Sequence, residues 1–175
     1  FTHVAQASIT KLTPNSGQGG TACVIAGTGL LGGGSKIVSV KLVGVEVESI
    51  DKSANDKVSV TVKTSTQASK GGVTLVADSC ATVTATGAFT YVTLQKIETI
   101  APNKGQHNTV VTVKGTNLFG GGSKVKSITL AGEAPASIVS QNNGAVVVTL
   151  KDIAAKKGAV VITADSGAIV TSADG

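Results

Sequence analysis

The stretch GTGLLGGGSK, from Gly27 to Lys36, returns as GTNLFGGGSK, from Gly115 to Lys124, after a displacement of 115 − 27 = 88 residues. The same displacement relates ITKLTPNSGQ, which starts at Ile9, to IETIAPNKGQ, which starts at Ile97. Towards the end of each copy, VADSCATVT corresponds to TADSGAIVT after a one-residue deletion. Self-similarity at a fixed spacing is typical of repeat proteins. The sequence therefore predicts two copies of one domain.

Within each copy, short runs of alternating apolar residues are separated by turn residues. VSVTVK directs Val58 and the valines at the next alternate positions inward, and VVVTLK does the same with Val146, Val148 and Leu150. The chain is 41% hydrophobic but only 2% aromatic, and no segment has the sustained apolar periodicity of a helix. Short strands with regular turn signals indicate an all-β sandwich in which helices are absent or single turns.

The ends of the two copies indicate where the domains divide. FTHV, residues 1–4, matches FTYV, residues 89–92, at the same displacement of 88. We therefore interpret 1–4 as the closing strand of a preceding repeat, 5–92 as the first domain, and 93–175 as a second domain that lacks its last strand. Because both ends of the sequence fall at the same point of the 88-residue repeat, we expect an array of more than two domains. Strand donation between chains would explain the same ends, but a cut through a continuous polypeptide is the simpler explanation.

The order of these motifs resembles the IPT/TIG domain, an immunoglobulin-like module shared by plexins, some transcription factors and many extracellular repeat proteins. The resemblance implies an all-β fold of two tandem immunoglobulin-like (IPT/TIG) β-sandwiches arranged head to tail. It says little about function, because the fold hosts DNA binding, receptor ectodomains, enzyme accessory modules and surface arrays. The positions that carry the resemblance are Pro14, Gly17, Gly27, Leu30, Gly44 and Phe89-Thr90-Tyr91.

The glycine run resembles a phosphate-binding loop, but its context argues against that role. Such a loop follows a strand and opens a helix, whereas GGGSK leads into another predicted strand in both copies and lacks the spacing of a P-loop. We expect the loop to cross between sheets at the end of the sandwich, with Leu30 and Leu118 plugging that end. Phe89 and Tyr91 should supply most of the aromatic core.

A second use of the glycine loop is contact between the domains. The linker from Tyr91 to Ile97 is too short for a free tether. The predicted contacts therefore join the second glycine loop to the loop at residues 67–72. An ordinary permissive surface loop is the alternative. The predicted interdomain residues are Phe119, Gly120, Gly121, Gly122, Lys70 and Gly71.

The residue types that carry catalysis do not gather in this sequence. The aspartates fall singly in predicted turns, without the spacing of a calcium loop. His3 and His107 have no cysteine or aspartate at ligand spacing, and no G-x-S-x-G motif is present. The sequence therefore predicts no catalytic, metal or cofactor site and no enzymatic activity.

The net charge is +5, yet all fifteen basic residues are lysine and they are spread along the chain. Specific recognition of bases and phosphates depends heavily on arginine, so nucleic acid is not an expected partner. No apolar run approaches the length that spans a bilayer, and no signal peptide is visible. The lysines are better explained by solvated strand faces and protected sheet edges.

Both cysteines belong to the first copy. A disulfide between Cys23 and Cys80 is natural for an extracellular protein. However, Cys23 should lie in the middle of the second strand and Cys80 near the tip of the last hairpin, a separation near the limit for a bridge. The rival arrangement is a free buried Cys23 with a Cys80 that is exposed or bonded to another molecule. Both alternatives stay open from the sequence. Phe119 could stack on a sugar, but packing into the domain junction is the preferred interpretation.

These observations favour a structural segment of a long extracellular or cell-surface array of immunoglobulin-like repeats, such as a stalk, fibre or appendage. The expected partners are other copies of the repeat or chain, joined head to tail or laterally. The alternative is an adhesin or receptor ectodomain that binds a protein or glycan at the cell surface.

Overall fold

Alternating apolar residues form strands throughout the described chain. The computed structural model describes residues 3–172 and contains sixteen strands and no helix in that range. Contacts divide the chain into two compact units, Phe1–Val92 and Thr93–Gly175, called here the first and second domains. The predicted all-β, immunoglobulin-like fold is confirmed.

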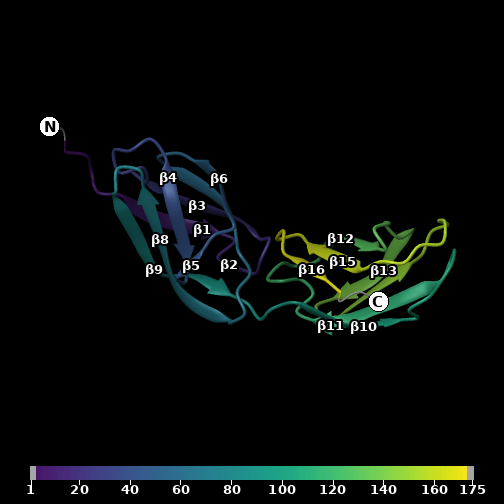
Figure 1. Cartoon of the computed structure of the whole chain (residues 1–175). Coiled ribbons are helices and arrows are strands. Elements are labelled where there is room, and N and C mark those ends of the chain that lie inside the picture. Colours follow the sequence, from purple (N-terminus) through teal and green to yellow (C-terminus); the bar gives the residue numbers. More distant parts are fainter. Residues whose placement is uncertain (1–2, 173–175) are drawn as a thin grey trace. The chain divides into compact units, whose positions relative to one another are not determined.

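Two sheets build the first domain (Figure 1). One has the order β1-β3-β7-β6, with β1 at Ser8–Thr13, β3 at Ala22–Thr28, β6 at Ser49–Ser53 and β7 at Lys57–Thr61. The other has the order β2-β9-β8-β4-β5, with β2 at Ser16–Gly17, β4 at Ile37–Leu42, β5 at Val45–Glu46, β8 at Ser69–Ala77 and β9 at Thr82–Tyr91. All pairs are antiparallel except β2 with β9, which is parallel.

The second domain repeats most of this topology. One sheet has the order β10-β11-β14-β13, with β10 at Lys96–Ala101, β11 at Val110–Thr116, β13 at Ser137–Asn142 and β14 at Ala145–Thr149. The other has the order β12-β15-β16, with β12 at Val125–Leu130, β15 at Val160–Ala164 and β16 at Ile169–Thr171. The register shift between Ile9 and Lys11 in β1 recurs between Ile97 and Thr99 in β10. The two copies therefore share backbone irregularities as well as sequence.

Each domain has its own apolar core, and the predicted inward faces supply it. Val58 and Val60 are fully buried in the first core, as Val146 and Val148 are in the second. Leu30 is 2% exposed and belongs to the first core, as a residue that plugs the end of the sandwich would.

Phe89 and Tyr91 provide the aromatic part of the first core. Their rings meet edge to face with centroids 5.2 Å apart, an arrangement that aromatic quadrupoles favour. Burial raises the pKa of Tyr91 to about 12, and its hydroxyl has no hydrogen-bond partner among the described residues. Their burial agrees with the prediction from FTYV.

The domains differ at their last strand. β9 has ten residues and reaches Tyr91, whereas β16 has three and ends at Thr171. Leu150 was expected to point inward like Val62, but it is only half-buried while Val62 is fully buried. The inward direction expected for Leu150 is confirmed, because the side chain packs against the second core although it is less buried than Val62.

Candidate functional site at the glycine loops

The glycine loops join two strands in each domain. In the first domain the loop runs from the end of β3 to β4, and it turns on itself through hydrogen bonds from the Gly32 amide to the Gly29 carbonyl, 2.8 Å, and from the Gly34 amide to the Leu31 carbonyl, 2.7 Å. The loop between β11 and β12 repeats both bonds with the same lengths. Because no helix follows, the loop lacks the helix N-terminus at which phosphate-binding loops hold their anion.

An aspartate from the next hairpin closes each loop. The Asp78 carboxylate, in the turn between β8 and β9, accepts the Ser35 amide at 2.9 Å and the Ser35 hydroxyl at 2.5 Å. Asp165 accepts the amide and hydroxyl of Ser123 at the same two distances. These bonds fasten a loop with few side chains to the turn that lies beside it at the same end of the sheet, where Ile37 pairs with Ala77.

The hydrogen bonds between the aspartate and the serine, called here the clasp, account for the pKa of the aspartate and for the glycine at position 34. Hydrogen bonds from Ser35 hold the pKa of Asp78 below its usual range, and those from Ser123 do the same for Asp165. A Cβ atom at Gly34 would lie 2.1 Å from Asp78 Oδ1, so the carboxylate can approach this closely only where glycine stands. The glycine loop therefore already binds an anion from its own domain, the Asp78 carboxylate.

An asparagine holds the other side of each loop. The Asn55 carbonyl accepts the Leu30 amide at 2.9 Å, and its side-chain Oδ1 accepts the Leu31 amide at 3.2 Å. In the second domain Asn143 accepts the amides of Leu118 and Phe119 in the same way, both at 2.9 Å. Backbone groups in both glycine loops are thus bound by two different hairpins of the same domain.

Each domain also holds its own end of the connecting segment. In the first domain, Gln18 Nε2 donates to the Val92 carbonyl at 2.9 Å. In the second, the Asn117 side-chain amide donates to the Thr93 carbonyl. Gln95 is 6% exposed, and its amide donates to the Leu118 carbonyl at 3.4 Å. Leu94 is the large apolar residue of this segment that stays exposed.

Gln18 is the most fully bonded polar side chain of the first domain. It is 0% exposed, its Nε2 also donates to the Ser65 carbonyl at 2.8 Å, and its Oε1 accepts the amides of Gly19 and Ser65 at 3.0 and 2.9 Å. Its counterpart in the second domain, Gln106, is exposed. This contrast separates the two domains more sharply than any difference in their cores.

A family model for the IPT/TIG domain matches residues 7–91 and again residues 96–174. The chain belongs to the IPT/TIG domain family. Its two tandem domains are therefore immunoglobulin-like modules of that family, as the motif order indicated. A search of curated proteins gave no match.

Solved structures match this chain at low sequence identity. The Plexin A4 full extracellular region matches with a TM-score of 0.60 and 19% identity, covering 99% of this chain and 16% of that one. A Bacteroides ovatus mixed-linkage glucan utilization locus SGBP-B, solved with a mixed-linkage heptasaccharide, matches with a TM-score of 0.39 and 15% identity, covering 97% and 42%. This chain thus spans less than half of each of these two proteins.

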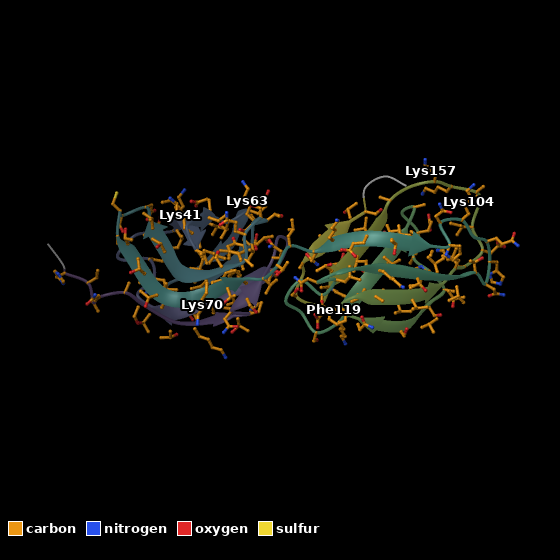
Figure 2. The ribbon with its side chains drawn as sticks, turned by 90° about the horizontal axis from the view of Figure 1, so that it is seen from below. Lys41, Lys63, Lys70, Lys104, Phe119 and Lys157 are labelled. Carbon is orange, nitrogen blue, oxygen red and sulfur yellow. The ribbon has the colours of Figure 1, made fainter. Side chains whose placement is uncertain are left out.

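The residues predicted to join the IPT/TIG domains occupy different settings. Phe119 is half-buried and packs against the core of its own domain, and Gly120 is buried (Figure 2). Lys70 is exposed. Lys70 and Gly71 were expected in a loop, but they belong to β8 and pair with Thr90 and Phe89. That expectation was wrong because the pairing with β9 extends β8 through the glycines. Contact between the domains through these residues remains a prediction.

Sequence reasoning missed the aspartate and asparagine that fasten the loops. The sequence indicated no more for Asp78 and Asp165 than single acids in predicted turns, and it gave no role to Asn55 or Asn143. The available signal was recurrence, because each residue stands at the same place in both copies. When a polar residue stands in the same turn of both domains, it indicates a hydrogen bond that each domain requires.

The two cysteines of the first IPT/TIG domain are both free in the structure. Cys23 lies in β3, is buried, and its thiol donates to the Pro14 carbonyl at 3.3 Å. Burial raises the pKa of this thiol to about 11. Cys80 is exposed in the turn between β8 and β9. The structure thus has the arrangement of a buried Cys23 and an exposed Cys80.

Other candidate sites are few in the described part of the chain. A pocket of about 370 Å³ lies in the first domain against its glycine loop and is lined also by Val4, Ala5, Leu31 and Asn55. Within residues 3–172, no three His, Cys, Asp or Glu side chains are grouped to hold a metal ion. None of the described residues forms a helix long and apolar enough to cross a membrane.

Removing the carboxylate of Asp165 should weaken the second domain in a pH-dependent way. A carboxyl with a lowered folded-state pKa contributes stability above its ordinary pKa and loses that contribution as the pH falls through the folded value. We therefore expect Asp165→Asn to lower the thermal midpoint by a few degrees at pH 7, and the gap to the wild type to close below about pH 4. Calorimetry across this range measures both effects. Asp152→Asn, at an exposed position, is the control; a gap independent of pH would contradict the clasp.

Proposed function

We propose that this chain is a structural segment of a long extracellular array of IPT/TIG domains, in which spacing and stiffness are the function. The observation that carries the proposal is the bonding of the connecting segment. Gln18 holds the carbonyl of Val92, and Asn117 holds that of the next residue, Thr93. A connection anchored at adjacent residues by both domains has little free length over which to hinge.

The glycine loops support the same function. Their amides are already bonded to Asp78 and Asn55 in one domain and to Asp165 and Asn143 in the other. A loop whose polar groups are bonded within its own domain is suited to be a rigid end of that domain. The Plexin A4 extracellular region, described as domains 1 to 10, shows that this fold occurs in long extracellular chains.

The stiffness of the pair can be measured in solution. We expect small-angle scattering and interdomain spin-label distances of the isolated chain to fit one narrow distribution. Asn117→Ala should broaden that distribution, because it releases the Thr93 carbonyl. Asn103→Ala, which changes an exposed residue in the turn after β10, should leave it unchanged. If the two domains of the wild-type chain hinge freely, the proposed function as a stiff spacer is wrong.

An adhesin or receptor ectodomain is the second candidate, and the pocket beside Val4 and Leu31 is the observation that favours it. Such a pocket places apolar carbon next to backbone amides and the Asn55 side chain, a combination that suits a small polar ligand. Binding of the isolated chain to a glycan or cell-surface protein panel, lost in Leu31→Asp, would move the assignment to this candidate.

A further inference from the structure

The two glycine loops differ at one position where both chains turn in the same way. Gly29 in the first domain and Asn117 in the second stand at the same place of the repeat. Their φ angles are both positive, 63° and 54°, a backbone region that glycine and asparagine enter more readily than most residues. The second domain therefore carries a carboxamide side chain where the first carries only a hydrogen atom. Phe119, labelled in Figure 2, marks the second loop.

In the second domain, the Asn117 carboxamide bridges two polar groups. Its Oδ1 accepts a hydrogen bond from Asn143 Nδ2 at 3.3 Å, and its Nδ2 donates to the Thr93 carbonyl. A carboxamide can do both, because its oxygen accepts hydrogen bonds while its nitrogen donates them. One side chain thus joins the turn between β13 and β14 to the first residue of the domain.

The first domain has the same two polar groups without the bridge. Asn55 is the counterpart of Asn143, and Ala5 is the counterpart of Thr93. Asn55 Oδ1 is used within the glycine loop. Within the described part of this domain, neither Asn55 Nδ2 nor the Ala5 carbonyl has a hydrogen-bond partner. A donor and an acceptor are therefore left unpaired where the second domain has its bridge.

The pocket beside the glycine loop lies at this position. Gly29, Ala5 and Asn55 all line this pocket of about 370 Å³. A Cβ atom at Gly29 would lie 3.4 Å from Ala7 Cα and 3.6 Å from the Ala5 carbonyl oxygen, which are ordinary contact distances. A group that enters over Gly29 can therefore reach the Ala5 carbonyl without displacing the backbone.

The remaining side chains around the pocket are apolar. Leu31 and Val4 line it, and the Val4 methyl carbons would lie 3.7 Å from a Cβ atom at Gly33. The described residues that line the pocket include no aromatic ring, so a sugar has no flat apolar face on which to stack. The pocket thus suits a short apolar chain that ends in a polar group, which is the form of an asparagine or glutamine side chain.

We propose that this pocket binds the carboxamide of an asparagine or glutamine side chain presented by a partner protein. The carboxamide oxygen accepts from Asn55 Nδ2 and its nitrogen donates to the Ala5 carbonyl, as the Asn117 carboxamide does within the second domain. Val4 and Leu31 contact its methylene groups. The proposal rests on the binding role given above as the second candidate function, and it names the ligand of that pocket.

The same groups select against charged side chains of similar shape. A carboxylate has no hydrogen atom to donate to the Ala5 carbonyl, and it would approach the Asp78 carboxylate, which lies against Gly34 of the pocket lining. An ammonium group cannot accept a hydrogen bond from Asn55 Nδ2. A site that pairs with both ends of an amide rejects an analogue that leaves one end unpaired.

Two peptides that differ in one group test this selection. We expect acetyl-Ala-Gln-Ala-amide to shift the side-chain amide signals of Asn55 in heteronuclear NMR spectra of the whole chain. For so small a contact the dissociation constant should lie in the millimolar range. The same peptide with glutamate in place of glutamine should bind at least about tenfold more weakly, because it leaves the Ala5 carbonyl unpaired.

Two substitutions exchange the arrangements of the two domains. Gly29→Asn should place the bridge of the second domain in the first, abolish binding of the glutamine peptide there, and raise the thermal midpoint of the first domain. Asn117→Gly should create a second site, so that the peptide also shifts the side-chain amide signals of Asn143. The second variant removes a side chain, so its result does not depend on how a new one packs.

A further variant removes only the donor. Asn55→Asp keeps an oxygen to accept the Leu31 amide but loses the Nδ2 group, and it should weaken binding of the glutamine peptide at least about tenfold. Asn103→Asp makes the same chemical change at an exposed position in the turn after β10, and it should leave binding unchanged.

Three results would overturn the inference: no shift with the glutamine peptide, equal binding of the two peptides, or binding that survives Gly29→Asn. A partner whose binding is lost in Leu31→Asp but kept in Gly29→Asn would leave the second candidate function standing without its carboxamide ligand. The stiff spacer is tested independently, because the stiffness of the pair is measured without any ligand.

Discussion

Gln18→Ala is expected to destabilise the first domain by about 3 kcal/mol, because four hydrogen bonds made by a buried side chain to half-buried backbone groups would be lost. The side chain makes four hydrogen bonds, to Gly19, Val92 and both backbone groups of Ser65. Alanine leaves the Ser65 and Val92 carbonyls without their donor and opens a space that was fully buried. Denaturant unfolding of the chain, followed domain by domain, measures the loss.

Gln106→Ala is the matched control for this prediction. The same residue at the same place in the repeat is exposed. Its backbone amide donates to Thr109 Oγ1 and its carbonyl accepts the Thr109 amide, and neither bond needs the side chain. We therefore expect a change within about 0.5 kcal/mol. Equal losses for the two glutamines would show that burial of Gln18 does not decide its contribution.

Phe89→Ala should cost the first domain about 3–5 kcal/mol. The phenyl ring is fully buried, lies edge to face with Tyr91, and belongs to a strand bonded on both sides. Alanine would leave a cavity where Phe89 stood and would loosen the last strand. The transition of the second domain should keep its midpoint, because its core contains only its own residues. Thermal and denaturant unfolding with separate probes in each domain test both statements.

The control for this loss is Thr90→Ala, one residue along the same strand. Thr90 keeps its main-chain bonds to Asn15 and Lys70, and its side chain is only half-buried. We expect less than about 1 kcal/mol from this change. A loss as large as that of Phe89→Ala would show that the cost is not specific to the buried ring.

Local patterns predicted a large part of the fold because they act through nearest neighbours. Alternation in VSVTVK placed Val58 and Val60 inward, and both are fully buried. The repeat of 88 residues indicated two domains, and the motif order identified the IPT/TIG family. Leu150 shows the limit of such patterns, since alternation places it inward but only a strand packed over it could bury it.

The sequence by itself determined the strand periodicity, the repeat, the family and the absence of a recognisable catalytic motif, because each of these is read from residue types at short or fixed spacing. Only the tertiary structure decided that Asp78 closes the glycine loop and that Gln18 is buried while Gln106 is exposed. These features depend on groups up to 74 residues apart in sequence, such as Gln18 and Val92. Their partners are brought together only when the sheets pack, so no local pattern contains them.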